Sequence, residues 1–152
     1  MIHWEKQKKI KTLYELYSRP VRTKYGLTQM EYSILMFLHR DPACDTASLI
    51  VQTNQFTKSH VSSAVKELEE RRLVTREYQD NNKKTIHLKL TDEAQVIVQE
   101  AVVLRERYME TLFTGFSDEE RQQIKSFFER ICGNAEAELQ KLADGESDKG
   151  SK

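Results

Sequence analysis

The sequence predicts a mainly α-helical fold with one small β-hairpin near its middle. Glycine and proline are scarce, with 5 and 2 among 152 residues, which disfavours a loop-rich or all-β chain. Hydroxyl residues followed by acidic ones mark several expected helix starts, and two short runs of strand type lie close together. The length suits a single domain that can bury a core of its own.

Four helices are expected before the hairpin. The first covers about residues 3–18 and ends near the sequence SRP. The second runs from Thr28 to about His39, because TQME (residues 28–31) matches a capping box, in which a hydroxyl and a carboxylate satisfy two backbone N–H groups. A short third helix covers ASLIVQT, and the fourth begins with Thr57 as its N-cap.

The hairpin and two long helices complete the predicted order. The strand runs are LVTREY and TIHLKL, joined by the polar tip QDNNKK, residues 79–84. Thr91 is expected to cap the next helix, and SDEE (residues 117–120) is a second capping box before the last one. This order is typical of a helix-turn-helix with a β wing, placed between flanking helices.

The fourth helix, TKSHVSSAVKELEERR, carries unusual chemistry on its first turns. At about 100° per residue, one narrow stripe is apolar, and serines, a histidine and a lysine lie opposite or beside it. No acidic residue precedes Glu67. A helix in the major groove contacts base edges through its N-terminal residues, where hydroxyl and imidazole groups can form hydrogen bonds and acids would be repelled. The alternative is an ordinary amphipathic surface helix whose serine-rich start serves only as a cap.

Charge distribution favours the DNA-binding interpretation over that alternative. The chain has 24 basic and 24 acidic residues, so the field of the whole molecule cannot steer it to phosphate. Basic residues nevertheless gather in the expected DNA-facing part, namely Lys58, Lys66, Arg76, Lys83 and Lys84. Local segregation of charge therefore compensates for the neutral total.

Residues 27–95 resemble the MarR family of bacterial winged helix-turn-helix regulators. The resemblance rests on LTQMEYSILMFL, on the frame VSSAVKELEERRLV, and on the wing followed by LKLT. It implies a homodimer held by its terminal helices, with one helix in the major groove and the wing at the minor groove. It also implies a small effector, often an aromatic acid or a toxic compound, bound between the dimer helices and the DNA-binding lobe.

Five positions depart from the family pattern. Ser63 stands where an arginine is frequent, so direct guanine recognition is not expected there. Arg72 replaces a glycine before the strand, which would cost on the order of 1 kcal/mol in a left-handed conformation. In the wing, lysines replace an Arg-Arg pair, which keeps the charge but loses the planar fork suited to bidentate contacts. We therefore expect phosphate or loose minor-groove contacts from the wing. Ala94, where glycine is frequent, changes nothing functional.

These arguments define two sets of candidate residues. The expected DNA-binding residues are Thr57, Lys58, Ser59, His60, Ser62, Ser63, Lys66, Arg76, Asp80, Lys83 and Lys84. The residues suggested for an effector site are Tyr14, Tyr17, Tyr25, Tyr32 and Met36, each of which could equally belong to an ordinary core or interface.

The flanking helices carry more apolar surface than one small lobe can cover, which favours a two-fold dimer over a monomeric helical bundle. We expect a DNA-binding lobe over residues 27–91, dimerisation helices over 1–26 and 92–143, and a flexible tail over 144–152. The cysteines and histidines are scattered, so we expect no metal site or cofactor. The sequence shows no nucleophile–base pair and no phosphate-binding loop, so we do not expect an enzyme.

The predicted function is that of a cytoplasmic transcriptional regulator, a repressor that an effector could relieve, bound to a near-palindromic double-stranded DNA site. No apolar run is long enough for a membrane span, so no membrane partner is expected. The alternative function is a winged-helix protein-interaction module without a DNA role, which the zero net charge supports.

Overall fold

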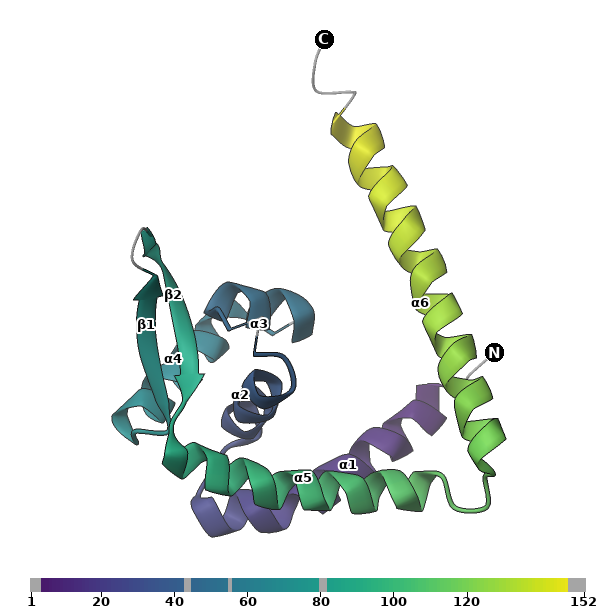
Figure 1. Cartoon of the computed structure of the whole chain (residues 1–152), viewed down its shortest axis with the longest axis horizontal. Helices are drawn as coiled ribbons and strands as arrows, with labels where there is room; N and C mark the ends of the chain where they lie inside the picture. Colours follow the sequence, from purple (N-terminus) through teal and green to yellow (C-terminus); the bar gives the residue numbers. More distant parts are fainter. Residues whose placement is uncertain (1–3, 43–44, 55, 80–81, 148–152) are drawn as a thin grey trace. The chain divides into compact units, whose positions relative to one another are not determined.

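The helices and the hairpin follow the predicted order in the computed structural model, which describes residues 4–42, 45–54, 56–79 and 82–147 (Figure 1). The elements are α1 (Trp4–Tyr25), α2 (Gln29–Arg40), α3 (Ala47–Asn54), α4 (Lys58–Glu70), β1 (Val74–Gln79), β2 (Asn82–Leu90), α5 (Asp92–Leu112) and α6 (Asp118–Ser147). They form two compact units, residues 1–109 and residues 110–152. The predicted fold class, mainly α with a small β wing, is confirmed.

Helix α1 is longer than predicted, since it continues through Pro20 to Tyr25 where we expected an end near residue 18. Proline lacks an N–H and its ring crowds the carbonyl four residues earlier, so a helix that contains it loses a backbone hydrogen bond. Packing offsets that loss, because Ser18 and Val21 on either side are 1% and 3% exposed. The sequence-based end was wrong because tertiary burial overrides the local preference.

Helix α2 begins with the predicted capping box and supplies the centre of the core. The hydroxyl of Thr28 accepts a hydrogen bond from the backbone N–H of Glu31 at 3.2 Å, and the Glu31 carboxylate accepts from the N–H of Thr28 at 2.9 Å. Apolar residues from α2, α3, α4, the hairpin and α5 close over one another in a single core. Its most deeply buried members include Ile34, Leu35, Ile50, Val61, Leu68, Val74 and Val98.

The end of α4 places a non-glycine residue in the left-handed region. Arg72 has a φ of 58°, and its N–H bonds to the carbonyl of Glu69 while the N–H of Leu73 bonds to that of Leu68, both at 2.9 Å. These two bonds are those of a Schellman motif. Gly26, which follows α1, has a φ of 59° and ends that helix in a similar way. Of the two endings that the sequence allowed for α4, the strained one is found.

The hairpin pairs β1 and β2 antiparallel, from Val74 opposite Leu90 to Tyr78 opposite Ile86, with an irregularity after Tyr78. Both strands extend into the segment expected to be the polar tip, because β1 ends at Gln79 and β2 begins at Asn82. A bridge between Thr46 and His87 ties β2 to the segment before α3. The wing is therefore anchored to the helix-turn-helix at its base.

Helix α5 packs against α1 within the first unit. The Tyr108 hydroxyl donates to the carbonyl of Ile10 at 3.3 Å, and the rings of Tyr14 and Tyr17 meet the Tyr108 ring at centroid distances of 5.3 and 5.8 Å. Thr91 caps α5, as predicted, by accepting from the N–H of Ala94 at 3.2 Å. Aromatic contacts therefore join the first and fifth helices around Tyr108.

The second unit consists mainly of α6, which starts at the predicted capping box. The N–H of Ser117 donates to the Glu120 carboxylate at 2.7 Å, and the Ser117 hydroxyl accepts from the N–H of Glu120 at 3.2 Å. The helix extends to Ser147, into the segment that we expected to be tail, and residues 148–152 lie outside the described residues. No described helix has the length and apolar character needed to cross a membrane.

Candidate nucleic-acid interface

The front face of α4 is exposed, and its rear face is buried as predicted. Val61, Ala64, Val65 and Leu68 are 0–7% exposed, so the apolar stripe fixes how the helix is rotated in the lobe. The candidate DNA-binding side chains on α4 are all exposed: Lys58, Ser59, His60, Ser62, Ser63 and Lys66. The structure thus brings six of the predicted residues onto one accessible surface.

The start of α4 differs from the other helix starts that the structure describes. Thr57 occupies the N-cap position, as expected, but its side chain makes no capping hydrogen bond. Thr28, Thr91 and Ser117 all cap their helices through a hydroxyl, and Thr46 caps α3 by accepting from the N–H of Leu49. The first turn of α4 also contains no acidic residue. Its first N–H groups therefore present positive potential that, among the described residues, neither the Thr57 hydroxyl nor a first-turn acid offsets.

Two of the predicted basic residues are already engaged by acids. Arg76 on β1 contacts the Glu69 carboxylate at 2.6 Å, and its side chain is 39% exposed. Lys66 lies 3.7 Å from Glu70, one turn along α4, but both side chains are largely exposed. Because exposed pairs contribute little, Lys66 can leave Glu70 at low cost. Arg76 instead joins the wing to the rear of α4, a role that the sequence did not reveal.

The tip of the wing is only partly described. Lys83 and Lys84 belong to β2, but their side chains lie outside what the structure describes, and Asp80 lies outside the described residues altogether. The strand places both lysines at the end of the hairpin far from α5. A basic wing tip therefore stays a prediction.

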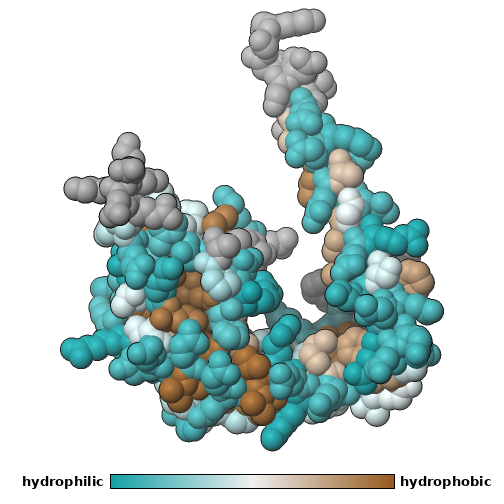
Figure 2. All heavy atoms as spheres, in the orientation of Figure 1, coloured by the Kyte–Doolittle hydropathy of each residue, from teal (hydrophilic) through white to brown (hydrophobic). Residues whose placement is uncertain are grey.

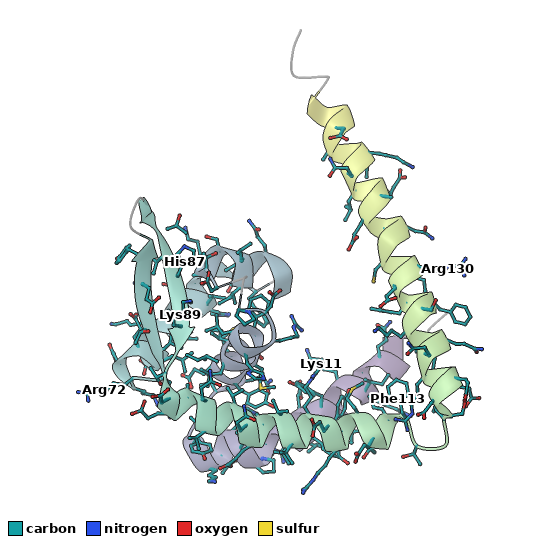
Figure 3. All side chains as sticks on the ribbon, viewed as in Figure 1. Lys11, Arg72, His87, Lys89, Phe113 and Arg130 are labelled. Carbon is teal, nitrogen blue, oxygen red and sulfur yellow. The ribbon has the colours of Figure 1, made fainter. Side chains whose placement is uncertain are left out.

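His87 is a structural residue that sequence analysis missed. Its Nδ1 lies 2.6 Å from the Asp45 carboxylate, and the two side chains are only 17% and 12% exposed. The N–H of Leu88 also donates to the carbonyl of Asp45 at 2.7 Å. In the strand run TIHLKL, His87 alternates with the apolar Ile86 and Leu88, a pattern typical of an outward position, and it lies on β2 beside Lys89 (Figure 3). The position is instead half-enclosed because the segment before α3 folds over it, fastening the wing to the helix-turn-helix.

Two of the five suggested effector residues line the same cavity. Tyr14 and Met36 line a cavity of about 440 Å³ in the first unit, together with His39, Arg40 and Arg105. Tyr17, Tyr25 and Tyr32 do not line it. Their own contacts are with Tyr108, Glu100 and Tyr14, respectively. Tyr32 is 1% exposed, and burial raises the pKa of its hydroxyl, so it stays neutral. Ligand binding at these residues stays a prediction.

The two helices α3 and α4, braced by α2 and followed by the β1–β2 hairpin, define a winged helix-turn-helix protein. Residues 25–84 match the sequence model of the MarR family, the family that the sequence resembles. No curated protein was found to be similar to the chain.

Solved structures share this fold over most of their length. A MarR family transcriptional regulator from Listeria monocytogenes, complexed with 26mer DNA, is 17% identical, covers 88% of this chain and 89% of its own, and has a TM-score of 0.74. The S. aureus MepR–DNA complex is 18% identical over 89% and 96%, with a TM-score of 0.70. A MarR family regulator from Silicibacter pomeroyi is 21% identical over 84% and 86%, with a TM-score of 0.71.

Proposed function

We propose that this protein is a transcriptional regulator that binds double-stranded DNA through the front face of α4 and the wing. The observation that carries the proposal is the exposed, acid-free first half of α4, whose uncapped start faces outward beside Lys58, Ser59 and Ser63. A helix end of this kind suits the major groove, where its first residues meet base edges and its N–H groups favour phosphate. Two similar structures are DNA complexes, which supports the same interpretation.

The protein is expected to act as a homodimer on a near-palindromic site. Apolar side chains on α6 are largely exposed, with Phe128, Ile131 and Leu139 at 65–66%, and brown apolar surface interrupts the polar surface of this helix (Figure 2). Exposed apolar surface of that extent implies burial against another subunit. A two-fold dimer would hold two α4 helices about one DNA turn apart, about 34 Å, and so select an inverted repeat.

A repressor role, relieved by a small molecule, completes the proposal. The cavity beside Tyr14 and Met36 combines apolar side chains with two arginines, Arg40 and Arg105, which would suit an anionic aromatic compound. It lies among α1, α2 and α5, so an occupant would contact both the DNA-binding lobe and the expected dimer helices. The effector and its effect on DNA binding belong to the proposal.

DNA binding is tested by fluorescence anisotropy with promoter DNA upstream of the protein's own gene. Affinity should fall steeply as salt rises, since Lys58, Lys66, Lys83 and Lys84 would displace counterions from phosphates. Lys83→Ala/Lys84→Ala should weaken binding and reduce the salt dependence. The matched control is Lys125→Ala/Lys141→Ala, which removes the same charge from α6, whose residues do not belong to the proposed interface. An affinity for DNA that changes neither with salt nor with the wing substitutions would contradict the proposal.

The second candidate function is a protein-interaction module that uses the winged fold without DNA. The zero net charge of the chain favours it, because DNA-binding domains are usually basic. Selection of bound duplexes from a random pool separates the two candidates. Recovery of an inverted repeat supports the regulator, and recovery of no enriched sequence at low salt supports the interaction module.

A further inference from the structure

Three helix ends of the first unit meet at one side chain, Arg71. Arg71 is the C-cap residue of α4, and its guanidinium donates to the backbone carbonyls of Gly26, at 3.1 Å, and Tyr25. Those carbonyls belong to the last turn of α1 and to the residue after it, where no further helical N–H follows to satisfy them. The planar fork of arginine can reach two such acceptors at once. Arg71 therefore caps α1 from the end of α4.

The same guanidinium contacts the start of α2. It lies 3.6 Å from Glu31, whose side chain is only 8% exposed and whose carboxylate also accepts from the N–H of Thr28. A largely buried carboxylate needs a nearby positive charge or several donors. Arg71 supplies that charge, so α1, α2 and α4 share one polar junction.

A second set of contacts joins this junction to α5. The Tyr25 hydroxyl donates to Glu100 at 2.7 Å, and the Lys24 ammonium contacts the same carboxylate at 2.7 and 2.9 Å. These hydrogen bonds, Lys24 first, lower the pKa of Glu100, which keeps the carboxylate charged. The end of α1 is thus held by α5 on one side and by Arg71 on the other.

The junction lies at the opposite end of α4 from the DNA-facing residues, so small rotations there are amplified. Twelve residues separate Arg71 from Ser59, which is about 18 Å along a helix. A rotation of about 10° at the junction would displace the front of α4 by about 3 Å over that length. One base pair rises by about 3.4 Å, so this displacement is close to a one-base-pair error in register.

We propose that Arg71 is a positioning residue that fixes the direction of α4 relative to α1 and α5, and thereby sets the half-site spacing that the dimer accepts. The inference rests on the proposed function, because spacing has meaning only for a dimer on DNA. It goes beyond that function by assigning spacing selectivity to a residue that does not face the DNA. A residue that served only to stabilise helix ends would affect stability and leave spacing unchanged.

The first test compares Arg71→Ala with the wild type on duplexes whose two half-sites are moved apart or together by one or two base pairs. We expect the wild type to bind one spacing more tightly than the others. In Arg71→Ala the ratio of affinities between the preferred and the altered spacings should fall about tenfold, since several charge-assisted bonds are removed. Affinity for a single half-site and its salt dependence should not change. Arg71→Lys should be intermediate, because an ammonium lacks the fork.

Arg72→Gly is the matched control, because it removes the same charge one residue along and leaves the junction intact. It should keep the wild-type spacing preference. Full retention of that preference in Arg71→Ala would overturn the inference. So would an equal loss of affinity at every spacing together with a lowered melting temperature, because that is the result of a purely structural cap.

The second test needs no DNA and separates failure of this inference from failure of the proposed function. Spin labels at Glu67→Cys on α4 and Gln99→Cys on α5, in a Cys44→Ser/Cys132→Ser background diluted with unlabelled protein, report the distance between the two helices. The wild type should give one narrow distribution of distances between the labels. This distribution should broaden in Arg71→Ala and stay narrow in Arg72→Gly. An unchanged distribution in Arg71→Ala would overturn the positioning role, whether or not the protein binds DNA. A wild type that binds no duplex would refute only the proposed function and the spacing that depends on it.

Discussion

Helices α4 and α6 carry the same kind of apolar pattern but meet very different surroundings. Both place apolar residues at intervals of three and four along the chain. In α4 those side chains are buried, with Val61 and Leu68 at 0% exposure, while in α6 Phe128 and Leu139 are 65% and 66% exposed. The pattern therefore predicts which face of a helix is apolar, and the rest of the chain decides whether that face is covered. For α6 a second copy of the protein is the proposed cover.

The largest effect should come from deleting matched leucines on the two helices. Leu68→Ala should lower the free energy of unfolding by about 2–5 kcal/mol, because it leaves a cavity in a closed core. Leu139→Ala removes the same atoms from α6, and its effect should shrink as dilution separates the subunits, because Leu139 is exposed in the single chain. Urea denaturation at several protein concentrations measures both. A concentration-independent loss for both variants would contradict the difference between the helices.

A charge on the apolar face of α6 directly tests whether a second subunit buries that face. Ile131→Glu should weaken dimerisation about a hundredfold, since an unpaired carboxylate would be buried at the centre of an interface. Gln122→Glu adds the same charge on the opposite face of α6 and should leave the dimer intact. Sedimentation equilibrium measures the dissociation constant. If both variants remain dimeric, the interface lies elsewhere.

The His87–Asp45 pair, which joins the wing to the helix-turn-helix, should contribute a smaller amount to the free energy of unfolding. His87→Ala should destabilise the protein by about 1–3 kcal/mol, because it leaves the half-enclosed Asp45 carboxylate without its partner. His87→Gln, which keeps a donor, should lose less, and Lys89→Ala on the same strand serves as the exposed control. Thermal unfolding followed by circular dichroism measures the change. Equal stability of the alanine variant at position 87 and the control would show that the pair contributes nothing.

The smallest effect concerns the two left-handed helix ends. Arg72→Gly should stabilise the protein by about 1 kcal/mol, because glycine adopts this conformation without strain. Gly26→Ala should destabilise it by a similar amount, since an added Cβ at Gly26 meets nothing within 4 Å and only the backbone conformation opposes it. Chemical denaturation of the two variants should thus give shifts of opposite sign. Shifts of the same sign would mean that packing outweighs backbone strain at one of the two ends.

Local signals in the sequence predicted local structure well. The capping boxes at Thr28 and Ser117 and the buried stripe of α4 depend on residues within one or two turns, and all three are found. The end of α1 was wrong because packing around Pro20, which is not a local property, carries the helix onward. The left-handed Arg72 could be anticipated only as one of two endings.

Contacts between distant residues could not be predicted in the same way. Asp45 and His87 are 42 positions apart, and Arg71 and Gly26 are 45 apart. Nothing in the spacing of either pair marks it, since each depends on how whole helices and strands are placed. Arg76 illustrates the same limit, because its charge suggested DNA while its nearest carboxylate, Glu69, is brought to it by the turn after α4.

The start of α4 has a consequence for how the protein would meet its target. Water must solvate the N–H groups that the Thr57 hydroxyl leaves unbonded, and solvated helix starts fray more easily than capped ones. A phosphate oxygen arriving along the helix axis would replace that water and order the first turn as it binds. Recognition and local folding would then be a single event, and amide exchange over the first residues of α4 should slow on complex formation.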